Sequence, residues 1–439
     1  MKYTFKGGIH PGGHKNTAKC PVKLFSDPKK VTIPMSQHIG APCDCLVKKG
    51  DRVLAGQKIG EVPAGALGCP VHSSVSGTVE KIEILPDLRG NQVKYVTIAN
   101  DFKNEPDPSI KPFGKKLADA TTDEIVSVIR EAGVVGMGGA GFPAYAKILS
   151  AVGKAETLII NCAECEPFLT ANYRLMIERP TEIINGAKII MKALGIRRAL
   201  IAVEDNKPLA IAKMESLTKA SAAFTVVTLK TKYPQGDERR LINALFRKEL
   251  PKGKLPADLG CVIFNAETLS AVFTAFAKGL PSIYRIVTVD GDCVAVPSNV
   301  LVPVGASVRE TVEFCGGLSY SPEKIVNGGP MMGLAVWSAD SPVTKTTSGL
   351  LLFSDEYSEK REESNCIRCG RCIRACPSGL APCYMAASIK SGNLDEANEV
   401  FHVTTCVECG SCAFGCPASI PLVQYFKLAK SELNKRRKK

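Results

Sequence analysis

Residues 133–143 read GVVGMGGAGFP, and residues 158–167 read LIINCAECEP. Glycine has no Cβ, so the four glycines between positions 136 and 141 let the backbone approach a phosphate or a flat ring closely. The apolar run at 158–160 is typical of a buried strand, which would deliver the polar residues that follow it to one edge of a sheet. Ligands bind at this edge in open α/β sheets. The pattern therefore predicts a ligand site, although a tight turn between a helix and a strand would explain the glycines alone equally well.

The length and composition indicate a globular chain of several domains. At about 150 residues per domain, 439 residues suggest about three domains. The N-terminus lacks an apolar signal segment, and no apolar run is long enough to span a membrane, so we expect a soluble cytosolic chain. Eighteen cysteines in such a chain favour metal or redox chemistry over disulfides.

The formal charge of +13 includes a basic tail at residues 431–439, which ends in KRRKK. This tail could be a solvated helix end, or it could contact an acidic partner or an anionic membrane surface. No aromatic residues are interleaved with the basic ones, so we expect no nucleic-acid partner.

The N-terminal hundred residues predict an extension followed by a small β module. Residues 1–30 are rich in Gly, Pro and Lys, and we expect them to lie over another domain. His10 and His14 lie between glycines and a proline that oppose a helix, which argues against a metal site there. Short β runs with glycine-rich turns fill residues 31–100, and VKKGDRVLAGQKIG followed by SSVSGTV resembles a biotinyl or lipoyl barrel-sandwich module. Where carrier modules have a modifiable lysine, this chain has residues 72–77, HSSVSG, so we expect packing or docking there.

Residues 115–282 alternate helix and strand patterns, which predicts βαβ units around a mainly parallel, Rossmann-like sheet. Thr121 and Glu124 form a capping-box pattern at the start of the first helix. Residues 283–340 return to β character around one helix at 307–315, and a compact β-grasp-like module fits this pattern. The class predicted for the chain is therefore multidomain α/β.

Residues 355–430 carry two copies of a cysteine motif, Cys-x2-Cys-x2-Cys-x3-Cys-Pro, that lie forty residues apart. This spacing is that of two-cluster ferredoxins, in which the fourth cysteine of each motif binds the other 4Fe–4S cluster. We therefore assign one cluster to Cys366, Cys369, Cys372 and Cys416, and the second to Cys406, Cys409, Cys412 and Cys376. Structural zinc would leave the third cysteine and the Cys-Pro pair unexplained. Clusters accept single electrons, whereas nicotinamide exchanges a hydride, so a flavin is required between them.

Four motifs carry a resemblance to a known family. GGAGFP at 138–143, NCAECEP at 161–167, YPQGDE at 233–238 and NAETL at 265–269 follow the order found in the FMN- and NADH-binding subunit of respiratory complex I. With the barrel-sandwich module and the paired ferredoxin motifs, the whole chain resembles the RnfC family, which are subunits of Rnf-type ion-translocating ferredoxin:NAD oxidoreductases. Two residues differ from the complex I pattern, because Met137 replaces the usual arginine and Ala163 the usual aspartate.

This resemblance implies the cofactors and their binding residues. FMN, bound non-covalently, would lie against the glycine loop, NAD(H) would be the substrate, and no residue would need to act as a general acid or base. Lys147 would meet a phosphate, Glu166 and Phe142 would contact NADH, and other residues would bound the flavin or close the nucleotide side. The implied cofactor-binding residues are Gly138, Gly139, Gly141, Phe142, Lys147, Asn161, Glu164, Glu166, Tyr233, Asp237, Glu238 and Asn265.

The resemblance also implies partners and a place in the cell. The chain would be a peripheral protein on the cytoplasmic face of the cell membrane, bound to integral-membrane and flavin or iron–sulfur subunits of the same complex, with ferredoxin acting indirectly. Two alternatives stay open: a cobalamin reductase of the related microcompartment type, and a non-catalytic iron–sulfur relay or docking subunit.

Overall fold

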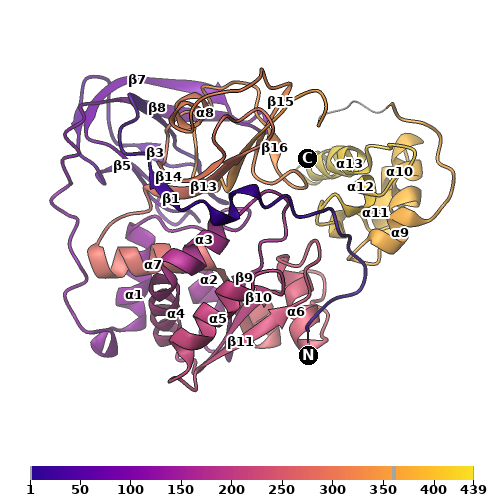
Figure 1. The fold of residues 1–439 in the computed structure, drawn as a ribbon, viewed down its shortest axis with the longest axis horizontal. Coiled ribbons are helices and arrows are strands. Elements are labelled where there is room, and N and C mark those ends of the chain that lie inside the picture. The colour runs from indigo at the N-terminus through magenta and orange to yellow at the C-terminus, as the bar shows by residue number, and fades with distance from the viewer. Residues whose placement is uncertain (1, 358–361, 439) are drawn as a thin grey trace.

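The computed structural model describes residues 2–357 and 362–438, with side chains up to Arg436. Residues 358–361 of the predicted ferredoxin-like domain and Lys439 of the predicted basic tail lie outside the described residues. Figure 1 shows the helices of the cysteine-rich part grouped at one side, next to the sheets of the rest of the chain. Within the described residues, no helix has the length and apolarity needed to cross a membrane.

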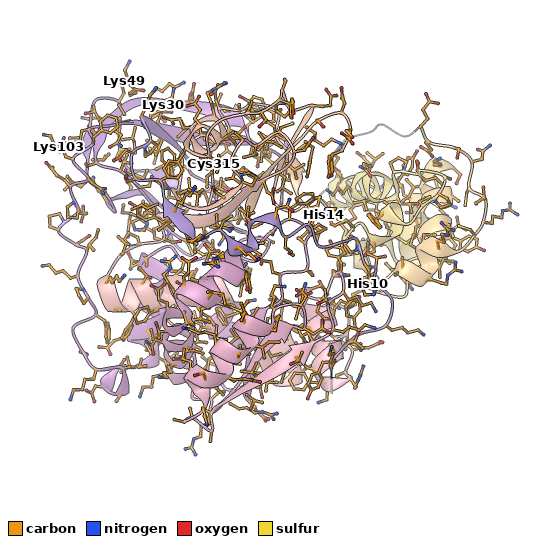
Figure 2. All side chains as sticks on the ribbon, viewed as in Figure 1. His10, His14, Lys30, Lys49, Lys103 and Cys315 are labelled. Carbon is orange, nitrogen blue, oxygen red and sulfur yellow. The ribbon has the colours of Figure 1, made fainter. Side chains whose placement is uncertain are left out.

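The N-terminal extension runs between the central domain and the cysteine-rich part (Figure 1). It contains η1 (Asn16–Lys19) and β1 (Val22–Leu24). Tyr3 bridges to Leu229, Ile9 bridges to Tyr233, and the Gly8 N–H donates to the Ala375 carbonyl at 2.9 Å. The extension therefore contacts two domains at once. Figure 2 labels His10 and His14 on this segment, and the ring of His14 stacks on Phe168 at 4.9 Å.

Two small sheets form the β module. The strands are β2 (Lys30–Pro34), β3 (Asp44–Cys45), β4 (Arg52–Val53), β5 (Lys58–Glu61), β6 (Val71–His72), β7 (Gly77–Pro86) and β8 (Gln92–Asn100). One sheet has the order β2-β8-β7-β4 and the other β3-β5-β6. Alternate residues such as Val31, Ile33 and Ile98 point into the shared core. The HSSVSG turn is a packing surface, as expected, because the Ser74 hydroxyl donates to the Val304 carbonyl at 2.5 Å.

The central domain is built on a fully parallel sheet of order β11-β10-β9-β12, as the alternating pattern predicted. Thr121 and Glu124 form the predicted capping box at the start of α1. The elements are η2 (Leu117–Asp119), α1 (Thr122–Glu131), α2 (Ala144–Ala151), β9 (Thr157–Cys162), α3 (Ala171–Glu178), α4 (Pro180–Leu194), β10 (Arg198–Glu204), α5 (Pro208–Thr218), β11 (Phe224–Leu229), α6 (Glu238–Phe246), η3 (Pro256–Leu259), β12 (Cys261–Asn265) and α7 (Ala266–Lys278).

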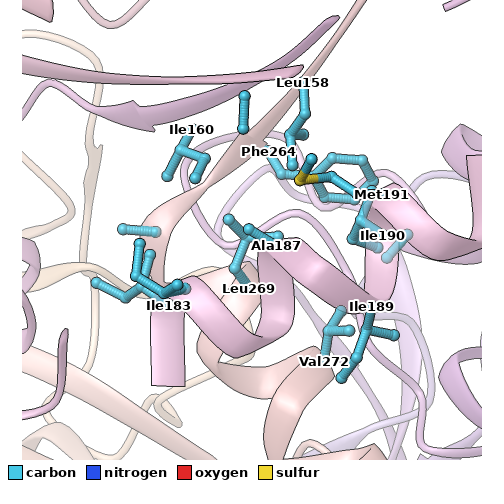
Figure 3. Close-up of a cluster of buried hydrophobic side chains, with 14 of the residues drawn as sticks. Leu158, Ile160, Ile183, Ala187, Ile189, Ile190, Met191, Phe264, Leu269 and Val272 are labelled. Carbon is cyan, nitrogen blue, oxygen red and sulfur yellow. The ribbon is translucent and has the colours of Figure 1, made fainter. Parts of the chain in front are cut away.

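Helices α4 and α7 cover one face of this sheet (Figure 3). Leu158, Ile160 and Phe264 point from β9 and β12 onto these helices, and each large side chain contributes about 1.5–3 kcal/mol through its burial. The helices touch at Gly186, where a Cβ would lie 1.9 Å from the Leu269 carbonyl oxygen. The parallel pairing of β9 with β12 places their carboxyl ends side by side, at the edge that the sequence singled out.

A six-stranded mixed sheet follows, of order β1-β14-β13-β17-β15-β16. Its elements are β13 (Tyr284–Asp290), β14 (Ser298–Pro303), α8 (Val308–Phe314), β15 (Lys324–Asn327), β16 (Leu334–Ala335) and β17 (Gly349–Phe353). The helix lies where it was predicted. The sheet extends beyond the predicted range 283–340, because β1 pairs with β14 and β17 pairs with β13 and β15. Short strands such as β1 give little sequence signal, since their pairing partner is distant in the chain.

The cysteine-rich part is helical and consists of two similar halves. Its elements are α9 (Arg371–Ala375), α10 (Pro382–Lys390), α11 (Leu394–Glu399), η4 (Val403–Thr405), α12 (Ser411–Phe414) and α13 (Leu422–Lys438). In each half a cysteine loop leads into a short helix and then a longer one. Met385 of α10 and Phe426 of α13 are fully buried in their common core.

Candidate functional site

The glycine loop leaves its backbone open at three positions. Gly138, Gly139 and Ala140 are exposed, and a Cβ built on Gly139 would meet no other atom within 4 Å. A Cβ on Gly138 would come within 3.0 Å of the Asn265 side chain. A flat ring or a phosphate can therefore approach the backbone here, where a larger residue would fill the space. Gly141 differs, because it is buried against Gln37 and Thr346 and its carbonyl accepts from the Ile39 N–H.

Two side chains that sequence reasoning missed hold the loop in place. The Thr268 hydroxyl accepts from the Met137 N–H at 2.9 Å, and Arg285 donates to the Met137 carbonyl at 2.6 Å. Arg285 is fully buried and forms an ion pair with Glu267, while it also donates to the Thr347 carbonyl. A buried ion pair is costly unless its remaining hydrogen-bonding groups are satisfied, and here the carbonyls serve that purpose. The only sequence signal was a charged residue inside an apolar strand pattern.

Asn161 and Asn265 lie next to each other at the carboxyl ends of β9 and β12. Their Cα atoms are paired in the sheet register, which brings the two strand ends together. The Asn161 amide donates to the Gly236 carbonyl at 2.9 Å, and the Asn265 amide oxygen accepts from the Glu267 N–H at 2.9 Å. The structure thus brings together three of the predicted site segments: the glycine loop, the end of β9 and the turn before α7.

Lys147 and Glu238 form an ion pair close to the carboxyl end of β12. The Lys147 ammonium group donates to Glu238 at 2.5 Å and to the Ile263 carbonyl at 3.0 Å. Asp237 caps α6 by accepting from the Arg240 N–H at 3.1 Å. Asp237 and Glu238 therefore lie at the start of α6, and Lys147 connects Glu238 with β12.

The side chain of Glu164 is directed into the protein. Its carboxylate accepts from the N–H groups of Asn172 and Tyr173, at 2.8 and 3.3 Å, at the start of α3. Lys15 of the N-terminal extension donates to the carbonyls of Glu164, Glu166 and Leu169, at 2.9, 2.7 and 2.6 Å. Burial lowers the pKa of Lys15. Glu164 and Lys15 thus hold the 164–169 segment in shape.

Glu166 and Tyr233 connect this site with the cysteine-rich part. The Glu166 carboxylate accepts from the N–H groups of Met331 and Met332, both at 3.0 Å, and the Tyr233 side chain lies close enough to interact with it. Burial raises the pKa of Glu166 to about 7. Tyr233 is buried, and its hydroxyl donates to the Cys409 carbonyl at 2.7 Å. One aromatic side chain therefore spans from the predicted nucleotide site to a predicted cluster ligand.

The four cysteines assigned to the second cluster surround one small cavity. Cys376, Cys406, Cys409 and Cys412 line it, and apolar residues such as Leu380 and Phe426 form its remaining wall. Burial raises the pKa of the Cys406 thiol to about 11. Four converging thiols in an apolar pocket fit a 4Fe–4S cluster, whose iron would hold them as thiolates.

The cysteines of the other cluster lie at the surface. Cys366 and Cys369 are exposed, whereas Cys372 and Cys416 are partly buried. Cys372 lies close to Cys383, a further cysteine near the motifs. Within the described part of the chain, no three His, Cys, Asp or Glu side chains are close enough for a single metal ion.

Family models match almost every part of this architecture. Residues 3–103 match the RnfC barrel sandwich hybrid domain, and residues 129–274 match the Nuo51 FMN-binding domain. Residues 286–335 match the SLBB domain, and residues 358–417 match a 4Fe-4S dicluster domain. The multidomain order predicted from the sequence is confirmed, and FMN and 4Fe–4S clusters are confirmed as its cofactors.

Relatives with named functions match over most of their length. The chain is 43% identical over 388 residues to the RnfC subunit of the Na(+)-translocating ferredoxin:NAD(+) oxidoreductase complex of Acetobacterium woodii, covering 87% of this chain and 86% of the relative. It is 42% identical over 434 residues to the RnfC subunit of the proton-translocating complex of Clostridium ljungdahlii, covering 98% and 94%. The chain belongs to the RnfC family. The RnfC subunit of Rhodobacter capsulatus is 40% identical over 441 residues, covering 99% of this chain and 84% of the relative.

A solved structure shares the fold of this RnfC chain. An NAD⁺-reducing NiFe hydrogenase in its H₂-reduced state aligns with a TM-score of 0.51 and 18% identity, covering 74% of this chain and 67% of that one. At this identity the likeness concerns the fold alone. Because the alignment covers 74% of this chain, the shared fold includes more than the central α/β domain.

Proposed function

We propose that this RnfC subunit passes electrons between NAD(H), bound with FMN at the glycine loop, and the rest of the complex through its two clusters. The observation that supports this most directly is the contact of Tyr233 with both Glu166 and Cys409, because it joins the nucleotide site to a cluster ligand. We also propose that the central domain has a Rossmann-like fold and that the six-stranded module has a β-grasp-like fold.

The residues at the carboxyl ends of β9 and β12 fit FMN. Gly139 leaves room for the ring, Gly138 lets the loop lie close to Asn265, and the amides of Asn161 and Asn265 would hold the polar edge of the ring or the ribityl chain. When bound, FMN supplies the exchange between a hydride, which carries two electrons, and the single electrons that clusters accept. The chain itself contributes alignment, because a loop fixed by Thr268 and Arg285 presents one geometry.

The other predicted residues would bind the nucleotide substrate or support those that do. Lys147 would exchange part of its contact with Glu238 for a phosphate, and Phe142 and Glu166 would contact the nicotinamide. Tyr233, Asp237 and Glu238 would border the nucleotide. Gly141 and Glu164 would act through the backbone that they hold in place.

We assign the cluster of Cys376, Cys406, Cys409 and Cys412 as the first to receive electrons. Tyr233 contacts its Cys409, and Asp237 of the nucleotide border lies close enough to interact with the same sulfur. The cluster of Cys366, Cys369, Cys372 and Cys416 would come second, nearer the surface.

The relatives are named as subunits of ion-translocating complexes, so this chain acts with other subunits. We place it as a peripheral subunit on the cytoplasmic face of the membrane. Its direct partners would be integral-membrane and flavin or iron–sulfur subunits of that complex, and ferredoxin would act through them.

Cofactor analysis of one anaerobically reconstituted sample tests this function. We expect FMN together with two clusters, and bleaching of the cluster absorption when NADH is added. Protein without FMN that shows no bleaching would instead be a relay or docking subunit. Rapid reduction of cob(III)alamin by the isolated chain would point to a cobalamin reductase.

A further inference from the structure

The two cluster loops are structural copies of each other, so their residues can be compared position by position. Arg368 and Glu408 occupy the same place and have φ values of 55° and 58°. The following glycines, Gly370 and Gly410, have φ values of 68° and 79°, and each precedes a short helix, α9 or α12. The exposure and charge of the two loops can therefore be compared at matching positions.

The loop of the second motif is covered from within the chain. Tyr233 donates to the Cys409 carbonyl, and the Met331 carbonyl oxygen lies 3.0 Å from the place that a Cβ on Gly410 would take. Ser411 is fully buried. In the proposed function, electrons from the flavin site thus reach this cluster across the face of the loop that Tyr233 and Met331 cover.

The same face of the first loop is open. A Cβ on Gly370 would meet only the end of the Arg374 side chain, at 3.5 Å. Cys366 and Cys369 are exposed, and Ile367 is 67% exposed. The Cys366–Arg374 loop, residues 366–374, therefore presents a cluster face to solvent, and among the residues that the structure describes no segment covers it as Tyr233 and Met331 cover its copy.

The charges of the two loops are opposite. Arg368, Arg371 and Arg374 are exposed, and none of them forms an ion pair with the residues that the structure describes. Their counterparts in the second loop are Glu408, Ser411 and Phe414. Glu408 is paired with Lys430 at 2.6 Å. Three unpaired positive charges around an exposed apolar residue are complementary to an acidic surface with an apolar centre.

We infer that the Cys366–Arg374 loop is the docking surface for an acidic redox subunit, which approaches this cluster as Tyr233 and Met331 approach the other. The inference rests on the proposed function, because it identifies where electrons enter or leave. One electron passes from the reduced cluster to a one-electron centre of the partner, so the cluster is oxidised and the partner reduced, and no bond is formed or broken. The arginines speed association and orient the partner, since opposite charges steer encounter.

Charge reversal tests this surface on membranes of the source cells that have been washed free of this subunit. The holoprotein and its variant R368E/R371E/R374E are mixed with these membranes without NADH, and bound protein is measured by sedimentation. We expect the variant to bind about tenfold more weakly and wild-type binding to weaken with added salt. The matched control R89E/R197E/R198E changes the same amount of charge at exposed arginines elsewhere, and it should bind as the wild type does.

A second readout separates this inference from the proposed function. NADH should bleach the clusters of the charge-reversed variant as fast as those of the wild type, while electron delivery to the membranes falls with binding. If the variant binds the membranes and delivers electrons to them as well as the wild type does, the docking surface is wrong. If the wild type binds the membranes but its clusters are not reduced by NADH, only the proposed function is wrong. If the glutamate variant lacks a cluster, the variant R368Q/R371Q/R374Q is used in its place. We again expect weaker binding to the membranes, and unchanged binding would contradict the inference.

Discussion

The Tyr233 hydroxyl lies 2.7 Å from the Cys409 carbonyl oxygen and donates a hydrogen bond to it. Tyr233 also contacts Glu166, so a single buried ring connects the edge of the parallel sheet with the cysteine-rich helices. The order of the domains along the chain does not reveal this contact, because the two residues are 176 positions apart. The predictions below test this connection and the two sites that it joins.

Tyr233→Phe should slow electron transfer between the two sites while leaving both cofactors bound. The ring stays, but the Cys409 carbonyl loses a buried donor, which costs about 1–3 kcal/mol. We expect cluster reduction by NADH to slow several-fold in rapid-mixing absorbance measurements. Tyr320→Phe, at a residue that is 69% exposed, is the control and should change nothing. An unchanged rate in Tyr233→Phe would show that the hydroxyl has no part in the transfer.

Gly139→Val should abolish flavin binding and spare the clusters. A branched side chain at this open position would fill the space in front of the loop that the flavin needs. It would not clash with the protein itself, because no other atom lies within 4 Å of a Cβ built there. We expect the FMN content to fall to a small fraction of the wild-type value with iron and sulfide unchanged. Gly139→Ala provides a graded comparison with an intermediate loss. Full FMN occupancy in the valine variant would place the flavin elsewhere.

Arg285→Met should destabilise the central domain and weaken FMN binding. The substitution leaves the Glu267 carboxylate buried without its cation and the Met137 carbonyl without a donor. Removing one partner of a buried ion pair costs about 3–5 kcal/mol. Thermal unfolding and FMN titration measure the two effects. The double variant Arg285→Met/Glu267→Gln should recover part of the stability, and failure to recover any would mean that the ion pair is not the cause.

Glu166 should make the stability depend on pH between about 5 and 7. Its folded pKa is raised to about 7 from a usual value of 4.5, so the folded protein binds a proton that the unfolded chain has released. The contribution of this proton to the free energy of unfolding is present at low pH and is lost as the pH rises through 7. The melting temperature of the wild type minus that of Glu166→Gln should therefore fall across this range in anaerobic calorimetry. A difference that is constant with pH would show that Glu166 has an ordinary pKa.

The sequence predicted those features that depend on local pattern. The parallel sheet follows from alternating apolar segments, the capping box from Thr121 and Glu124, and the cluster cysteines from their spacing. Resemblance supplied the roles of Asn161 and Asn265, which the sheet register then placed together. The supports of the site could not be predicted, because Lys15, Thr268 and Arg285 act on backbone groups far away in the sequence. Glu164 looked like a ligand residue by its place after a strand, yet its carboxylate caps α3.

The order of the two clusters is the central claim, and rapid mixing of NADH with two serine variants tests it most directly. Cys369→Ser should remove the surface cluster, and the remaining cluster should be reduced by NADH at the wild-type rate with FMN retained. Cys376→Ser should remove the cluster next to Tyr233. The remaining cluster should then be reduced at least about tenfold more slowly, because the rate of electron transfer falls with distance. The reverse pattern, with fast reduction in Cys376→Ser and slow reduction in Cys369→Ser, would contradict the account.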